Sequence, residues 1–203
     1  MSEEYFYPNR WGRVVLTSAE EILGDKGVAA LLNLAGLPHL IGNYPPDDMD
    51  KAFPFEYVSK IQQAFWEMYG GRGAQVFATR AGEQSFADGL SQFGKVAQAA
   101  QMAMRIGSLE QRIKIGLEFF AKFFNAVSDQ KVRVEEDETH WKWVIERCPM
   151  CWGRKADEPV CHLAVGVLKA ASSWASEGER FRVKPVQCIA MGAEEGIILI
   201  DKP

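Results

Sequence analysis

The chain has 203 residues, of which 47% are hydrophobic and 25% charged, and its formal net charge is -4. This composition is typical of a globular protein that buries a core without disulfides. The mild charge and the lack of a long basic run argue against a nucleic-acid partner. No apolar run approaches the roughly 20 residues that span a bilayer, and the start Met-Ser-Glu-Glu is not a secretory signal. We therefore expect a cytoplasmic protein with no membrane partner.

The N-terminal region, residues 1–72, is expected to be helical. Ser18 is a candidate N-cap, and Gly24 is expected to end the short helix that follows it. A second short helix is expected over residues 27–35. From Phe55 onward, apolar residues spaced three and four apart predict a longer helix with one apolar face.

Glycines at 70–73 are expected to end that helix. The remainder, residues 73–203, is expected to form a ligand-binding domain that makes one compact unit with the N-terminal region. Helices are predicted over residues 76–93, 95–105 and 109–127, and the last of these is the most aromatic helix of the chain.

After residue 128 the hydrophobic pattern changes from helical spacing to alternation. Alternation over residues 132–135 and 141–146 predicts a β-hairpin. A cysteine-containing loop follows, then a helix in which Gly166 permits close packing against another element. A second hairpin is expected over residues 181–200, which places Cys188 inside a strand. The predicted order is several helices followed by β-β-α-β-β.

All four cysteines lie in the last third of the chain, at Cys148, Cys151, Cys161 and Cys188. A C-x2-C pair positions two thiolates to share one tetrahedral metal, and two further sulfurs complete an all-cysteine zinc shell. Such a shell leaves no open position for water or substrate. We therefore predict a structural zinc that clamps the loop, the following helix and the second hairpin together.

Three alternatives to this zinc site stay open. Some of the cysteines, Cys188 above all, fit small core residues. His162 could replace a neighbouring cysteine as a ligand. The pair Cys148-Pro-Met-Cys151 could be redox-active, although that chemistry favours a pair at a helix N-terminus in a βαβ unit.

Large aromatic residues predict either a ligand cavity or a plain core. On spacing alone they fit a core, but their position beside the small residues of the helix over 95–105 suits an enclosed cavity, and ligand cavities are mostly apolar. The candidate ligand-binding residues are Phe93, Phe119, Phe120, Phe123, Phe124, Trp141 and Trp143.

No catalytic constellation is visible in the sequence. The three histidines are dispersed, and no nucleophile-elbow, zinc-protease or dinucleotide-binding motif occurs.

The order C-P-x-C, then P-x-C-H with a helix containing Gly166, then Val-Gln-Cys188-Ile-Ala-Met-Gly192 and a final apolar strand resembles one known family. It is the 4-vinyl-reductase domain, also called the hydrocarbon-binding domain, in its stand-alone type. The signature covers residues 130–201. Related domains act as sensors in phenol- and xylene-responsive transcriptional activators.

The resemblance implies an α+β fold in which a four-stranded antiparallel sheet, β-β-α-β-β at the C-terminal end, is covered by N-terminal helices. It also implies a homodimer, a small-molecule pocket between sheet and helices, and a zinc near that pocket with Cys161 and Cys188 as ligands. Two further ligands of the phenol sensors are replaced here by Pro185 and Gly196. The first cysteine pair offers the natural substitutes.

We therefore expect a zinc-braced protein that binds or senses a small hydrophobic or aromatic ligand and passes that state to a downstream protein partner. The alternative is a tetrapyrrole vinyl reductase or an accessory protein of tetrapyrrole metabolism, although no nucleotide or flavin motif is visible, so an enzyme is the less favoured hypothesis. A third hypothesis is a scaffold subunit whose interior is filled by side chains and holds no ligand.

Overall fold

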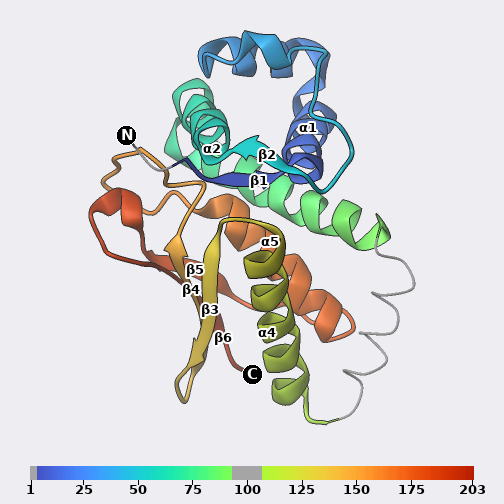
Figure 1. Ribbon diagram of the computed structural model, residues 1–203. Coiled ribbons are helices and arrows are strands. Elements are labelled where there is room, and N and C mark those ends of the chain that lie inside the picture. The colour runs from blue at the N-terminus through green and yellow to red at the C-terminus, as the bar shows by residue number, and fades with distance from the viewer. Residues whose placement is uncertain (1–3, 93–106) are drawn as a thin grey trace.

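The computed structural model describes residues 4–92 and 107–203 (Figure 1). Its main sheet has four antiparallel strands in the order β3-β4-β6-β5. They are β3 (Lys131–Glu136), β4 (His140–Arg147), β5 (Val183–Gln187) and β6 (Gly196–Asp201). The helix α5 (His162–Ala175) separates the two hairpins. The predicted α+β fold and its β-β-α-β-β order are confirmed.

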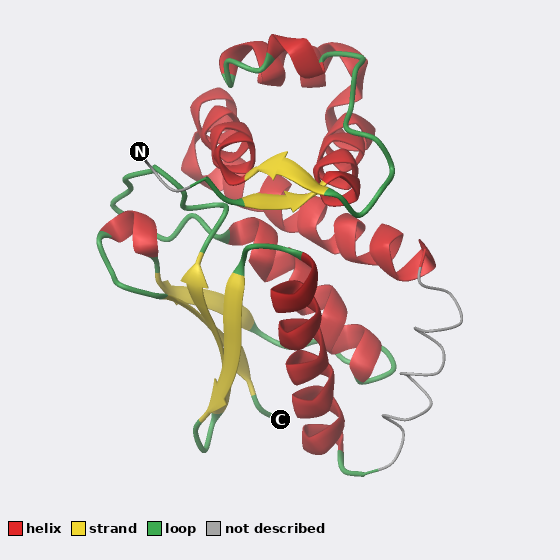
Figure 2. Cartoon of the chain, in the orientation of Figure 1, coloured by secondary structure: helices red, strands yellow, loops and turns green. Residues whose placement is uncertain are grey.

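One face of this sheet is apolar and packs against helices. Alternate residues of the central strands, among them Trp141, Trp143, Ile198 and Ile200, are buried. The helix α4 (Leu109–Val127) and α5 cover this face, and the long helices of the N-terminal half lie beyond them (Figure 2). Ser108 caps α4 with the reciprocal side-chain hydrogen bonds of a capping box.

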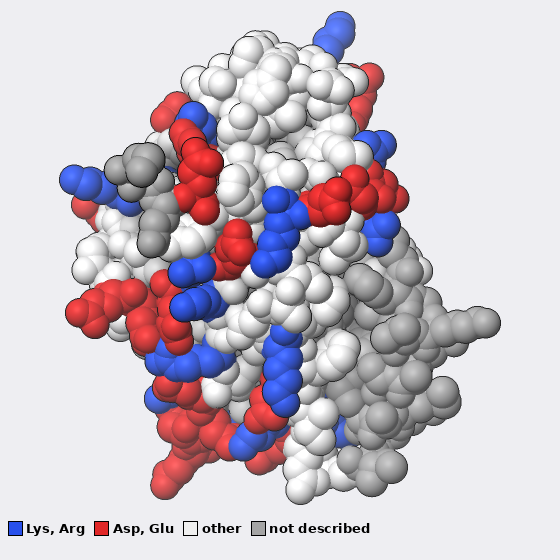
Figure 3. All heavy atoms as spheres, viewed as in Figure 1, with Lys and Arg blue, Asp and Glu red and all other residues white. Residues whose placement is uncertain are grey.

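The other face of the sheet is charged. Arg133 on β3 forms ion pairs with Glu146 at 2.7 Å and with Glu195 at 2.7 Å. Acidic and basic side chains gather over the β3–β4 hairpin, as Figure 3 shows. The apolar interior therefore lies on the side of the helices.

The N-terminal half consists of two long helices, α1 (Asn9–Leu34) and α2 (Phe55–Gln92). Each is kinked at a glycine, Gly24 with φ 69° and ψ 167° and Gly70 with φ 68° and ψ 170°. These backbone angles are accessible almost only to glycine. The predicted helix ends at these two glycines are therefore kinks between consecutive helical segments.

The prediction that Ser18 caps a helix is wrong. Ser18 is fully buried inside α1, which begins nine residues earlier at Asn9. The preceding stretch contains Val15 and Leu16, which pack into the core and extend the helix upstream. Burial of an apolar face therefore outweighs the local capping signal.

A small two-stranded sheet, which the sequence patterns did not indicate, joins the segment before α1 to the segment before α2. Strand β1 (Phe6–Pro8) pairs antiparallel with β2 (Lys51–Pro54). Strands this short carry almost no periodicity, and each ends in proline. Single turns of 3-10 helix occur at Pro38–Leu40 and Ile189–Met191.

Cys188 was expected inside a strand and instead follows the end of β5. The pairing of β5 with β6 is irregular between Pro185 and Gln187 and ends at Gln187, and Cys188 then precedes the short 3-10 turn.

Helices α2 and α5 cross at backbone contact. A Cβ atom on Gly166 would lie 2.0 Å from the Thr79 carbonyl oxygen, and one on Gly82 would lie 2.1 Å from the Leu163 carbonyl oxygen. The predicted close packing at Gly166 is confirmed, and its counterpart is Gly82.

One hydrophobic core runs from the N-terminal helices to the sheet and includes Leu16, Ile61, Ile113 and Ile198. The proposed division between residues 72 and 73 falls within α2 and stays a prediction. Across the described ranges, no helix has both the length and the apolar character that crossing a membrane requires.

Replacing Gly70 with alanine is expected to destabilise the fold by about 1–3 kcal/mol, because a Cβ atom is strained at these backbone angles. Urea unfolding of the variant and the wild type would measure the loss. Gly89→Ala is the matched control, since its Cβ would meet no atom within 4 Å. An equal stability of Gly70→Ala and the wild type would contradict the strain at the kink.

Candidate functional site

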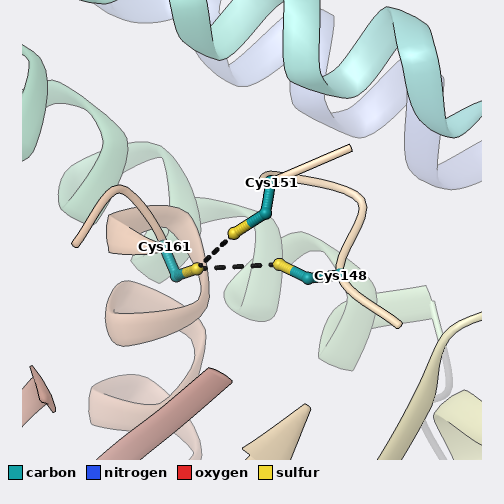
Figure 4. Close-up of side chains that lie close together, drawn as sticks. All are labelled: Cys148, Cys151 and Cys161. Carbon is teal, nitrogen blue, oxygen red and sulfur yellow. Dashed lines mark hydrogen bonds between the residues drawn. The ribbon is translucent and has the colours of Figure 1, made fainter. Parts of the chain in front are cut away.

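Three separate segments bring the four cysteines together. Cys148 and Cys151 lie in the loop after β4, Cys161 immediately precedes α5, and Cys188 follows β5. All four side chains are buried. The Cys161 sulfur lies 3.6 Å from that of Cys148 and 3.1 Å from that of Cys151 (Figure 4). The Cys188 sulfur lies 3.2 Å from that of Cys151 and 3.7 Å from that of Cys161.

The donor set of this cluster fits a metal ion. The sulfurs of Cys148, Cys151 and Cys161 lie within 4.8 Å of one another, so these three residues could hold a metal. Four sulfurs around a tetrahedral zinc, at about 2.3 Å each, lie about 3.8 Å apart. The sulfur–sulfur distances given above are somewhat shorter than that spacing. Cys188 lies beside Cys151 and Cys161 but is not one of the three residues that could hold the metal.

The cluster shifts the pKa values of its thiols in opposite directions. Although burial acts the other way, hydrogen bonds with the Cys151 and Cys161 sulfurs hold the pKa of Cys148 well below its ordinary value. Hydrogen bonds with the Cys148, Cys151 and Cys188 sulfurs, together with burial, raise the pKa of Cys161 well above its ordinary value. Thiolates are the form that binds metal, so a bound metal would displace the Cys161 proton.

A half-buried arginine accompanies the cluster. Arg154 donates from Nε to the Gln63 side chain at 3.1 Å and from Nη1 to the Met150 carbonyl at 3.1 Å. Burial lowers the pKa of Arg154, and the nearby cysteines, Cys151 first among them, act in the opposite direction. Arg154 therefore ties the cysteine loop to α2 and places a positive charge near the sulfurs.

The two other hypotheses for this loop have less geometric support. His162 is the first residue of α5 and, within the described ranges, does not belong to the metal-holding group. The Cys148–Cys151 pair lies in a loop and not at the start of a helix, where thioredoxin-type chemistry places it.

A cavity of about 360 Å³ lies between α1, α2, α4 and α5. Its described lining is almost entirely apolar, and Arg10 is the single charged side chain in it. The aromatic residues of the lining are Tyr7, Trp11, Phe86, Phe119, Phe120, Phe123, Phe124 and Trp174.

The structure brings the four phenylalanines of α4 together at this cavity. Trp141 and Trp143 lie in the core on the inner face of the sheet and are not among the lining residues. Trp143 contacts Phe124 with ring centres 6.1 Å apart. Phe93 lies outside the described residues.

Four aromatic lining residues were not among the expected ones: Tyr7, Trp11, Phe86 and Trp174. Tyr7 lies on β1, a strand too short to show a pattern. Trp11 precedes the region where a helix was expected, and Phe86 lies in a helix whose orientation the sequence does not set. Trp174 lies three residues after the buried Ala171 on α5, so helical spacing places it towards the inner face of the helix. Among these residues, only the helical spacing of Trp174 could have indicated from the sequence that the side chain faces inward.

The aromatic rings hold one another in place. Phe120 packs edge-on against Phe86 at 5.3 Å and against Trp174 at 6.0 Å between ring centres. Trp11 packs edge-on against Phe124 at 4.8 Å. Edge-to-face pairs of this kind add to the stability gained from burial. The cavity therefore has walls built of mutually packed rings.

Tyr7 is a cavity residue on which the cysteine cluster acts electrostatically. It lines the cavity, is buried, and donates its hydroxyl to the Gln130 side chain. Burial, and then the charges of Cys148 and Cys161, raise the pKa of Tyr7 well above its ordinary value.

No family model matches the chain, and no curated protein matches it significantly. Solved structures do share its fold. The phenol-responsive sensory domain of the transcription activator PoxR, with phenol, is 15% identical over 71% of this chain and 72% of that chain, with a TM-score of 0.51. An H-NOX domain from Shewanella oneidensis in an Fe(II)CO ligation state is 11% identical over 94% of this chain and 97% of that chain, with a TM-score of 0.57.

A trafficking protein particle complex subunit 3 from Naegleria fowleri, covalently bound to palmitic acid, is also similar. It is 15% identical over 73% of this chain and 93% of that chain, with a TM-score of 0.56. At these identities the likeness shows the fold.

Proposed function

We propose that this chain is a small-molecule-binding protein of the hydrocarbon-binding type, in which the cavity takes a hydrophobic or aromatic ligand and a zinc ion braces the neighbouring loop. The observation that carries the proposal is the aromatic cavity between four helices. Its volume of about 360 Å³ lies in the range of ligand pockets, about 300–1,000 Å³.

The chemistry of the lining supports a ligand with an apolar body. Eight aromatic rings and several aliphatic side chains present no ordered set of hydrogen-bonding groups, so binding would come from burial of apolar surface. The shared fold with a domain solved with phenol and with a subunit bound to palmitic acid supports the same class of ligand.

The described lining does not fit an iron cofactor such as the one held by the H-NOX domain. It contains no histidine, cysteine or methionine, and the Tyr7 hydroxyl is already bonded to Gln130. The scaffold hypothesis requires side chains to fill the interior, and the cavity volume argues against that. A vinyl reductase has no specific support.

Zinc is the metal that best suits the cluster, because buried cysteine sulfurs are the donors typical of structural zinc sites, and Cys188 would supply the fourth. In this proposal the zinc holds the loop after β4, the start of α5 and the end of β5 together. We further propose that the protein acts in the cytoplasm as a homodimer and passes its ligand state to a protein partner.

Titration with the neutral fluorescent probe phenylnaphthylamine tests the ligand site. We expect saturable binding to the wild type and a loss of roughly ten-fold or more in affinity in Gly89→Leu. Gly89 lines the cavity, and the space beside it is open, so a leucine side chain would occupy the site without a clash.

Ser91→Leu is the matched control, because Ser91 lies on the same helix and is exposed. Affinity equal to the wild type is expected for this control. Failure of the wild type to bind the probe, or equal binding by both leucine variants, would contradict the proposed site.

A further inference from the structure

Arg10 places a positive charge at one end of the cavity. It lies in the first turn of α1, next to Trp11, and is the single charged side chain in the described lining. Its side chain is 26% exposed, which places it at the rim. The rest of the described lining is apolar apart from Ser85 and Tyr7.

The guanidinium of Arg10 is held in place by the loop before β2. Its Nε donates to Asp47 Oδ1 at 2.6 Å, and its Nη2 donates to the Asp47 carbonyl at 3.2 Å. The backbone N–H groups of Asn9 and Arg10 are likewise bonded, to the carbonyls of Asp50 and Asp48. Several hydrogen bonds to the loop before β2 thus hold the start of α1, and with it the Arg10 side chain, in place.

The ion pair leaves Arg10 able to bind a second anion. Asp47 is 57% exposed, and exposed ion pairs contribute only about 0–1 kcal/mol. A guanidinium has five N–H donors, and the bonds to Asp47 use two of them. Arginine pairs readily with a further carboxylate through its remaining donors.

We propose that the ligand is an amphipathic anion, with an apolar or aromatic body in the cavity and a carboxylate that binds Arg10 at the rim. This inference rests on the proposed ligand-binding function and narrows it. A neutral hydrocarbon would leave Arg10 without a role in binding. In an amphipathic anion, the apolar body packs against the aromatic rings and the carboxylate binds the guanidinium.

Competition experiments with two matched ligands test the proposal. Phenylbutyrate and phenylbutanol have the same apolar body and differ in the end group, and each displaces bound phenylnaphthylamine. We measure the preference for the acid as the ratio of the two inhibition constants. In Arg10→Met, which keeps an apolar stem, this preference is expected to fall about ten-fold.

Two further variants test the same preference for the acid: one is expected to raise it, and the other is expected to leave it unchanged. Asp47→Asn removes the carboxylate that competes for Arg10, and it is expected to raise the preference for the acid about three-fold. A loss of folding could not produce such a gain. Arg13→Met removes the same charge one turn away, on a residue that does not line the cavity, and is expected to leave the preference unchanged.

The outcomes distinguish the anionic ligand from the proposed ligand-binding function on which it rests. Probe binding with equal displacement by acid and alcohol, or with the same preference in Arg10→Met as in Arg13→Met, overturns the anionic ligand and leaves the apolar site intact. Absence of probe binding overturns both.

Discussion

Replacing Cys161 with serine is expected to release the metal and to destabilise the fold by about 4 kcal/mol or more, because the binding energy of a structural zinc is part of the folding energy. Cys161 is the cysteine whose sulfur contacts those of Cys148, Cys151 and Cys188. Zinc content by elemental analysis and the midpoint of urea unfolding would measure the two effects.

A strong chelator supplies the control for this prediction. The chelator should lower the unfolding midpoint of the wild type to that of Cys161→Ser and should leave the variant unchanged. Equal zinc content and an equal midpoint in variant and wild type would rule out the metal clamp.

Replacing Gly82 with alanine is expected to cost about 3 kcal/mol, the upper part of the range for overpacking. The new Cβ would lie 2.1 Å from the Leu163 carbonyl oxygen and 2.9 Å from the Val167 nitrogen. These are backbone atoms, so relief requires that α2 and α5 separate. The free energy of unfolding from urea titration would measure the loss.

The same helix again provides the control. Gly89→Ala introduces the same methyl group into open space and should be neutral or stabilising by up to about 1 kcal/mol. Equal stabilities of the Gly82 and Gly89 variants would show that α2 and α5 can separate at no cost, and would contradict the prediction. Because Leu163 and Val167 also line the cavity, Gly82→Ala should weaken binding of phenylnaphthylamine as well.

The C-terminal half could be predicted from the sequence because its signals are local and agree with one another. Alternation around Trp141 and Trp143 marks a strand with one buried face, and that face is buried in the structure. The spacing of Cys148 and Cys151 indicates a shared metal whatever the surrounding fold. In the structure Cys161 lies beside this pair, and the three residues could hold a metal.

The N-terminal half was harder to predict because tertiary contacts override its local signals. The Ser18 cap is locally reasonable, yet burial of Val15 and Leu16 extends the helix past it. The pairing of β1 with β2 joins residues about forty-five positions apart and has no local pattern. Its consequence, the placement of Tyr7 and Trp11 at the cavity, was therefore hidden in the sequence.

The cavity itself depends on how helices cross, which spacing does not reveal. The phenylalanines of α4 were recognisable as a group, but the same spacing fits a filled core. The contact between Gly82 and Gly166 and the kink at Gly70 set the path of α2, and this path leaves space beside Phe86 and Gly89. Such space can be found only from coordinates.

Fluorine NMR of protein labelled with fluorophenylalanine, with and without phenylnaphthylamine, tests the ligand cavity most directly. We predict shifts at Phe86 and at the four phenylalanines of α4, which line the cavity, and none at Phe65 and Phe77, which stack on each other and are not in the described lining. Shifts at Phe65 and Phe77 with unchanged resonances from α4 would contradict the proposed cavity.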